Sequence, residues 1–330
     1  MRRREFIAAL GGATMSWPRH AAGQQTDPAR RIAVLQELDS TDPEADRRVA
    51  AFERALESLG WINGHNIRID YRWDAGDPQR SRSSALEVIS LAPELILTAA
   101  SSVLKAVASE TKSIPIVFVL VADPVGLGFV ASLAHPGRNV TGFSGFEPAM
   151  GGKWLSLLKE AAPNVSHVRF LFNPVTAPFG ESLLGALAAA APTLALKVIA
   201  ATVHDEAEIE RAVIAAATES GGGMIVAPDA FTYVRRQEVV ALAAQHRLPT
   251  IYPFRGFVES GGLISYGIDL LAPFEQAAVY VDRILKGVKP AYLPVQGPIK
   301  FDLVVNLKTA KALGLDIPAT LLARADEVID

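Results

Sequence analysis

The stretch of residues 140–174 constrains the fold most, because it joins one complete strand-and-helix pattern to a second one of similar size. Residues 140–146 read as the last strand of the first pattern, where two glycines allow a bend. A helix is then expected over 150–162, and a new strand over 167–172. The sequence therefore predicts two lobes, and paired α/β lobes bind small molecules in the groove between them.

Both halves alternate short apolar strands with amphipathic helices, which is typical of parallel sheets covered by helices. In the first half we expect strands over 32–35, 67–73, 95–99, 114–121 and 140–146, and helices over 43–60, 78–91 and 101–111. In the second half we expect strands over 167–172, 197–203, 224–227, 250–253 and 263–266, and helices over 150–162, 180–191, 206–220 and 233–246. The predicted fold class is α/β, with two Rossmann-like lobes built on parallel sheets.

The last part of the chain is expected to serve both lobes. It contains a helix over 272–286, a proline-rich connector over 290–298, a strand over 301–305 and a helix over 307–313. We expect these segments to cross between the lobes and to form a hinge of several chain segments. The predicted boundaries are 24–146 for the amino-terminal lobe, 147–265 for the carboxy-terminal lobe, and 266–330 for the crossover segments that complete both.

The beginning of the chain follows a different pattern. Three arginines at 2–4 precede a short apolar run over 6–15, and small residues at 21–23 offer a cleavage site. This pattern predicts a secretory signal peptide over 1–23. The paired arginines also fit a twin-arginine signal, and an ordinary Sec signal with a basic start is the alternative. Because the apolar run is shorter than the roughly 20 residues that span a bilayer, we expect a soluble, exported protein in the periplasm.

The composition excludes several functional classes. The formal net charge is −3 and basic residues form no stripe, so nucleic acid and anionic membranes are not expected partners. The chain has no cysteine, which excludes disulfides, thiolate metal ligands and a cysteine nucleophile. Its six histidines show no pair at metal-ligand spacing, so no metal is expected.

No cofactor is expected either. The run GLGFVA at 126–131 resembles part of a dinucleotide-binding fingerprint. However, Asp123 and Pro124 separate it from the preceding strand, and the residues at 135–137 cut the following helix short. The run 142–145 likewise lacks the G-x-S-x-G pattern of a hydrolase serine.

Candidate site residues follow from the position of the strand ends, since ligands of open parallel sheets bind beyond the carboxyl ends of the strands. These ends carry hydroxyl, amide, carboxylate and aromatic side chains, a mixture that suits a small polar or zwitterionic ligand. The predicted ligand-binding residues are Ser101, Ser102, Asp123, Phe146, Asn173, Asp229, Tyr252 and Tyr266.

Each candidate also has a purely structural interpretation. Ser101 and Ser102 could begin a helix as capping residues. The two aspartates and Asn173, each next to a proline, could be turn residues that bond their own backbone. The aromatic residues could belong to the core or to the lobe interface.

The chain resembles the exported substrate-binding proteins of ABC transporters, a family related to tryptophan-binding and tyrosine-binding members. The matching stretches include VADPVGLGFVASLAHPGRNVTGFSGFEPAMGGKWLSLLKEAAP, VRFLFNP, IVAPD and HRLPTIYPFRGFVESGGLISYGID. The resemblance implies the type I periplasmic binding protein fold, and contacts to the solute at seven of the predicted residues, Phe146 not among them. One departure follows the first strand, where LQELDSTDP replaces the glycine- and serine-rich loop of many relatives.

The predicted function is that of a periplasmic solute-binding component of an ABC importer. It would bind a small organic solute, such as an amino acid, in the cleft between the lobes and present it to an ABC permease and its ATPase. We expect a monomer that has no catalytic activity. The alternative is a secreted α/β hydrolase or isomerase that uses Asp123 or Asp229 as a base.

Overall fold

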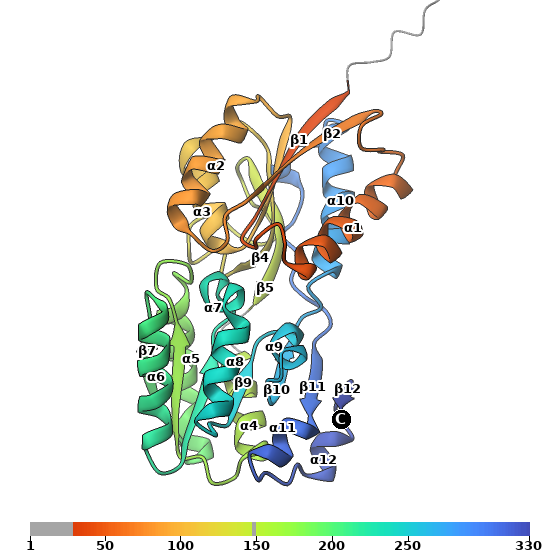
Figure 1. The fold of residues 1–330 in the computed structure, drawn as a ribbon. Coiled ribbons are helices and arrows are strands. Elements are labelled where there is room, and N and C mark those ends of the chain that lie inside the picture. Colours follow the sequence, from red (N-terminus) through yellow and green to blue (C-terminus); the bar gives the residue numbers. More distant parts are fainter. Residues whose placement is uncertain (1–28, 147–149) are drawn as a thin grey trace, which may run out of the picture.

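Two sheets form the cores of two α/β lobes, which lie one above the other in Figure 1. The computed structural model describes residues 29–146 and 150–330. The signal peptide predicted for 1–23 lies outside these residues. The predicted α/β fold class with two lobes is confirmed, while the lobe boundaries stay a prediction.

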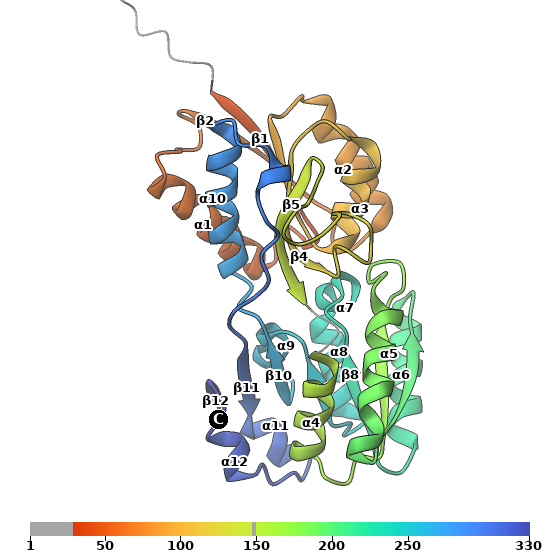
Figure 2. The same cartoon turned by 180° about the vertical axis from the view of Figure 1, so that it is seen from behind.

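The first sheet has five parallel strands in the order β2-β1-β3-β4-β5. The strands are β1 (Arg30–Gln36), β2 (Ile67–Trp73), β3 (Leu95–Ala99), β4 (Ile116–Ala122) and β5 (Val140–Phe146). Helices α1 (Pro43–Ser58) and α10 (Ala272–Leu285) cover one face, and α2 (Pro78–Ser90) and α3 (Ser101–Glu110) cover the other (Figures 1 and 2). Strand β4 is buried along its whole length because helices cover both of its faces.

The second sheet has seven strands in the order β12-β11-β10-β9-β8-β6-β7. They are β6 (His167–Phe172), β7 (Lys197–Thr202), β8 (Gly222–Val226), β9 (Thr250–Tyr252), β10 (Ile264–Gly267), β11 (Asp302–Asn306) and β12 (Glu327–Ile329). The helices of this lobe are α4 (Met150–Ala161), α5 (Gly180–Ala190), α6 (Glu206–Thr218), α7 (Ala230–Val234), α8 (Arg236–Gln245), α9 (Arg255–Glu259), α11 (Leu307–Ala312) and α12 (Ala319–Leu322). Only the β10–β11 pair is antiparallel among these strands.

The chain passes between the lobes three times. It leaves the first sheet after β5, returns from β10 to α10, and leaves again before β11. Helix α10 therefore packs against α1 in the upper lobe although it follows the second sheet in sequence. The segment that follows α10 stays attached to the first sheet before it crosses to β11. Its Gln296 carbonyl accepts a hydrogen bond of 2.8 Å from the amide of Ser144 on β5.

Some local predictions were wrong. The helix expected over 233–246 is interrupted at Arg235, whose ψ angle of 20° ends α7 before α8 begins. The short elements α9 and β12 were not predicted, because segments of five and three residues show no measurable periodicity. The antiparallel direction of β11 was also missed, since it depends on how the chain returns from the upper lobe.

Gly142 permits close contact between β4 and β5. Its φ angle is 154°, and a methyl group at this position would lie 2.0 Å from the carbonyl oxygen of Phe118. A backbone atom of a buried strand cannot move aside as a flexible side chain can. Gly142 is therefore required by packing.

We predict that Gly142→Ala lowers the free energy of unfolding by more than about 2 kcal/mol, because the methyl group forces β4 and β5 apart. Chemical denaturation followed by circular dichroism measures this change. The matched control is Gly185→Ala in α5, where a methyl group meets nothing within 4 Å and should stabilise the helix slightly. Equal stabilities of the two variants would contradict the prediction.

Candidate functional site

The carboxyl ends of the strands of the first sheet and of β6 to β10 in the second sheet face the boundary between the lobes, whereas β11 and β12 run the other way (Figure 1). The loop after β2 touches the amino end of α7 there. A methyl group on Gly76 would lie 3.5 Å from the carbonyl oxygen of Ala230, in the other lobe. The two lobes are therefore in direct contact at the strand ends, where a ligand of such sheets binds.

Ion pairs cross this boundary. Asp42, which caps the amino end of α1, accepts two hydrogen bonds of 2.7 and 2.8 Å from Arg236 of α8. Both side chains are nearly buried, at 11% and 13% exposure, so water screens this pair less than a surface pair. A weaker contact joins Arg47 of α1 to Glu259 of α9 at 3.5 Å.

Arg48 of α1 is a fully buried charge at the same boundary. Its guanidinium lies 2.7 Å from Glu37 and 3.2 Å from Glu44. The same group lies 5.7 Å from the ring of Tyr233 in the other lobe and 5.6 Å from the ring of Phe274. Burial alone would lower the pKa of Arg48, but the two carboxylates raise it above its usual value. Arg48 therefore stays charged and holds carboxylates and rings together.

Aromatic side chains join the lobes beside this charge. Phe146, at the end of β5, packs edge-to-face on Phe254 with ring centroids 5.3 Å apart, and its centroid is 6.4 Å from that of Trp154. Phe254 in turn packs on Tyr233 at 5.0 Å. Phe146, the last residue of β5, thus lies among aromatic rings of the second lobe.

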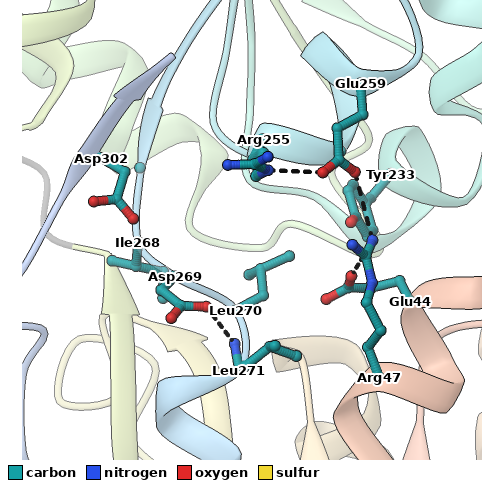
Figure 3. A pocket seen from close by; sticks show the side chains of 12 residues that line it. Glu44, Arg47, Tyr233, Arg255, Glu259, Ile268, Asp269, Leu270, Leu271 and Asp302 are labelled. Carbon is teal, nitrogen blue, oxygen red and sulfur yellow. Dashed lines mark hydrogen bonds and ion pairs between the residues drawn. The ribbon is translucent and has the colours of Figure 1, made fainter. Parts of the chain in front are cut away.

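A cavity of about 260 Å³ opens between the lobes next to the crossing segments. Charged side chains from both lobes line it, with Arg47 and Glu44 from α1 and Arg255 and Glu259 from α9 (Figure 3). The crossing segment at 267–271 and Asp302 close one side. Figure 3 shows Arg255 directed at Glu259, an ion pair of 2.7 Å. None of the eight predicted residues lines this cavity.

The structure places Asp229 and Asn173 together. Asp229 is buried at the amino end of α7 and accepts hydrogen bonds from the amides of Phe231 and Asn173 and from the Thr176 hydroxyl. Burial raises the pKa of Asp229 to about 6, although these hydrogen bonds oppose the shift. The side-chain oxygen of Asn173 accepts from the amide of Val175. Both side chains therefore organise the ends of β6 and β8.

Ser101 and Ser102 occupy the first turn of α3 and are buried. The residue before them, Ala100, has a φ angle of 72° and provides no side-chain cap. The Ser101 hydroxyl accepts a long hydrogen bond of 3.4 Å from the amide of Ala122. The amino end of α3 thus keeps backbone donors that no side chain caps. Asp123 lies nearby, and its carboxylate accepts from the amide of Gly126.

The two predicted tyrosines lie apart from this region. Tyr252 is buried in the second lobe, stacked on Phe257 at 4.8 Å. Tyr266 stacks on Phe301 at 5.7 Å, where the chain crosses between lobes, and Lys153 lies 5.7 Å from its ring. Their ligand contacts, like those of the other six residues, stay a prediction.

Sequence reasoning missed the charged residues Glu37, Asp42, Glu44, Arg48 and Arg236. Two signals were available. The departure LQELDSTDP contributes Glu37 and Asp42, and the spacing of Glu44 and Arg48 is that of an i,i+4 helix pair. Neither signal indicates burial, because that depends on the second lobe. Within 29–146 and 150–330, no cluster of metal-ligating side chains is found.

The comparison with known proteins agrees with this geometry. The sequence model of a family described as "ABC transporter substrate binding protein" matches residues 31–329. The chain belongs to this family. A tyrosine-binding protein of Clostridioides difficile (strain R20291) is 27% identical to it over 288 residues, which cover 87% of this chain and 81% of the relative. The resemblance predicted from the sequence is therefore confirmed.

Two solved structures of relatives differ in whether a ligand is bound. An ABC domain in complex with L-Trp from Streptococcus pneumonia superposes on this substrate-binding protein with a TM-score of 0.84, at 26% identity, covering 92% of this chain and all of that one. A ligand-free, open substrate binding protein from Clostridium difficile gives 0.66 at 27% identity, covering 91% and 99%. At nearly equal identity, this chain superposes better on the ligand-bound structure than on the ligand-free, open one. Ion pairs join its two lobes across the boundary.

In the described part of this substrate-binding protein, no helix has the length and apolar character to cross a membrane.

The raised pKa of the buried Asp74 should make the stability of the protein depend on pH. Burial raises its pKa to about 7, while hydrogen bonds from Ser81 and the Gly76 amide oppose the shift and the charge of Glu37 adds to it. Because the folded pKa exceeds the unfolded one, the contribution to stability is complete below about pH 4 and is lost as the pH rises through 7. We predict that Asp74→Asn weakens the fall in unfolding free energy between about pH 4 and 7.

Urea denaturation at four pH values measures this slope. The exposed Asp316 provides the control, because Asp316→Asn should leave the wild-type slope unchanged. An Asp74→Asn slope equal to that of the wild type would show that this carboxyl is ionised at neutral pH.

Breaking the ion pair of Asp42 should favour the open form of this substrate-binding protein. Asn remains a good amino-terminal cap, so Asp42→Asn removes the charge but keeps the start of α1. We predict a loss of about 1 kcal/mol from the closed form and a larger radius of gyration in small-angle X-ray scattering. Asp46→Asn, on the exposed side of the same helix, serves as the control. An unchanged radius would contradict the prediction.

Proposed function

We propose that this protein is the solute-binding component of an ABC importer and that it binds an amino acid between its two lobes. Family membership supports the transport role. The observation that carries the location is the closed boundary, where Asp42 and Arg236 pair across strand ends that face each other. The tyrosine-binding relative and the relative in complex with L-Trp support an amino acid as solute.

The chemistry of the boundary suits a zwitterion. The amino end of α3 has no side-chain cap, and the hydroxyls of Ser101 and Ser102 lie in its first turn. Backbone donors at a helix amino end favour a negative group, so a carboxylate fits there. The boundary also contains buried carboxylates, which suit an ammonium group, and aromatic rings, which suit an apolar side chain.

The mechanism follows from differential affinity. A solute that contacts both lobes stabilises the closed form only to the extent that it binds that form better than the open one. The three crossings of the chain provide the hinge for this motion. We propose that an ABC permease with its ATPase recognises the closed form, and that the protein is an exported, soluble monomer of the periplasm whose signal peptide covers 1–23.

The alternative function, a hydrolase or isomerase, has less support than solute binding, because of the hydrogen bonds that its proposed bases already make. The Asp229 carboxylate accepts three hydrogen bonds from protein donors, and that of Asp123 accepts one from Gly126. A general base needs an oxygen directed at its substrate. The three hydrogen bonds to Asp229 therefore favour a structural role for this carboxylate, and the binding function remains our conclusion.

Thermal unfolding in the presence of each of the twenty L-amino acids tests the proposal. A solute at about 100 times its dissociation constant adds roughly 2.7 kcal/mol, which raises the melting temperature by several degrees. The double variant with Ser101→Ala and Ser102→Ala should lose much of this rise. Ser109→Ala, exposed on the same helix, should retain it. The absence of any rise with all twenty would overturn the proposed solute class.

A further inference from the structure

Polar atoms without partners are buried at the end of β1. Gln36 is 1% exposed and Glu37 is 4% exposed. Nevertheless, both amide atoms of Gln36 and the Oε2 atom of Glu37 have no hydrogen-bond partner among the described residues. The buried hydroxyl of Thr98, near the end of the neighbouring strand β3, also has no hydrogen-bond partner among the described residues. Because buried polar groups in folded proteins nearly always have partners, these atoms indicate a missing one.

The position of Glu37 is determined by Arg48. The Oε1 atom of Glu37 accepts a hydrogen bond of 2.7 Å from Arg48, whose guanidinium lies 5.7 Å from the ring centroid of Tyr233. Tyr233 belongs to the other lobe. The second oxygen of Glu37 is therefore buried at the boundary between the lobes, beyond the end of a parallel strand, where a solute is expected.

The buried charges around Glu37 are not balanced. Glu37 and Glu44 both pair with Arg48. Arg47 also contacts Glu44, but its side chain is half exposed and lies at the rim. Two buried carboxylates thus share one buried guanidinium, and a positive charge from outside would complement them.

The buried carboxylate first considered for this role, Asp229, is already occupied. Asp229 accepts three hydrogen bonds from the protein, while Asp123 is only partly buried and accepts one from the amide of Gly126. By contrast, one oxygen of Glu37 is unused although the residue is almost completely buried. The comparison favours Glu37 as the group that contacts a donor of the solute.

We propose that Glu37, with Gln36 beside it, binds a positively charged N–H group of the solute. This inference rests on the proposed function and specifies which part of the solute the amino-terminal lobe recognises. The ammonium group of an amino acid fits, with the carboxylate placed toward α3. Gln36 is the last residue of β1, and Glu37 follows it directly.

Calorimetric titration of the wild type and Glu37→Gln tests this role. The probes are the twenty L-amino acids, two amines without a carboxylate (phenethylamine and agmatine), and 3-phenylpropionate, which lacks the amine. We expect Glu37→Gln to weaken ammonium-bearing probes at least tenfold, because a hydrogen bond to a charged group is lost. Binding of 3-phenylpropionate should not weaken. The control Glu57→Gln removes an exposed charge from α1 and should bind as the wild type does.

Equal affinity of Glu37→Gln and the wild type for the ammonium-bearing probes would overturn the inference and leave the proposed function standing. Binding of the amines, lost in Glu37→Gln, without binding of any amino acid would support the Glu37 site and overturn the amino-acid proposal. Binding of none of the probes would overturn both. If Glu37→Gln does not fold, Gln36→Met decides, because it keeps the Arg48 pair. That variant should weaken the ammonium-bearing probes several-fold, and an unchanged affinity would count against the inference.

Discussion

The buried guanidinium of Arg48 is the interaction on which the arrangement of the two lobes depends. A charge in this position is tolerated only with partners, and Arg48 has two carboxylates from its own lobe and a ring from the other. The carboxylates hold the charge, and the ring of Tyr233 extends the contact across the boundary. Opening of the lobes would separate Arg48 from Tyr233 and expose the group to water. The state of the lobes and the hydration of this charge are thus coupled.

Backbone geometry at the strand ends is also adapted to this boundary. Ala100, Leu120 and Asp123 have φ angles of 72°, 58° and 43°, which are unfavourable for residues other than glycine. Leu120 lies at a register shift between β4 and β5, and such a bulge redirects the end of a strand. Unfavourable backbone conformations persist only where surrounding structure enforces them, and three of the seven non-glycine residues with positive φ in the described part of the chain lie at the ends of β3 and β4.

Much of the fold could be predicted from the sequence because its elements have clear periodicity. The uninterrupted apolar run of β4 indicated a strand buried on both faces, and the four-residue spacing in α10 indicated an amphipathic helix. The break at Arg235, the five-residue α9 and the direction of β11 could not be predicted. Each of these features depends on contacts between segments that are far apart in the chain.

The candidate site, like the fold, could be predicted from the sequence only in part. Position at a strand end and family resemblance are properties of the sequence by itself, and these led to Ser101, Asp123 and Asp229. The sequence does not show which polar atoms already have partners. Only the tertiary structure decided that Asp229 is occupied by Thr176 and two amides, while Glu37 keeps an oxygen unused. The physical reason is that burial and hydrogen bonding depend on groups brought together by folding, whereas periodicity and composition are local.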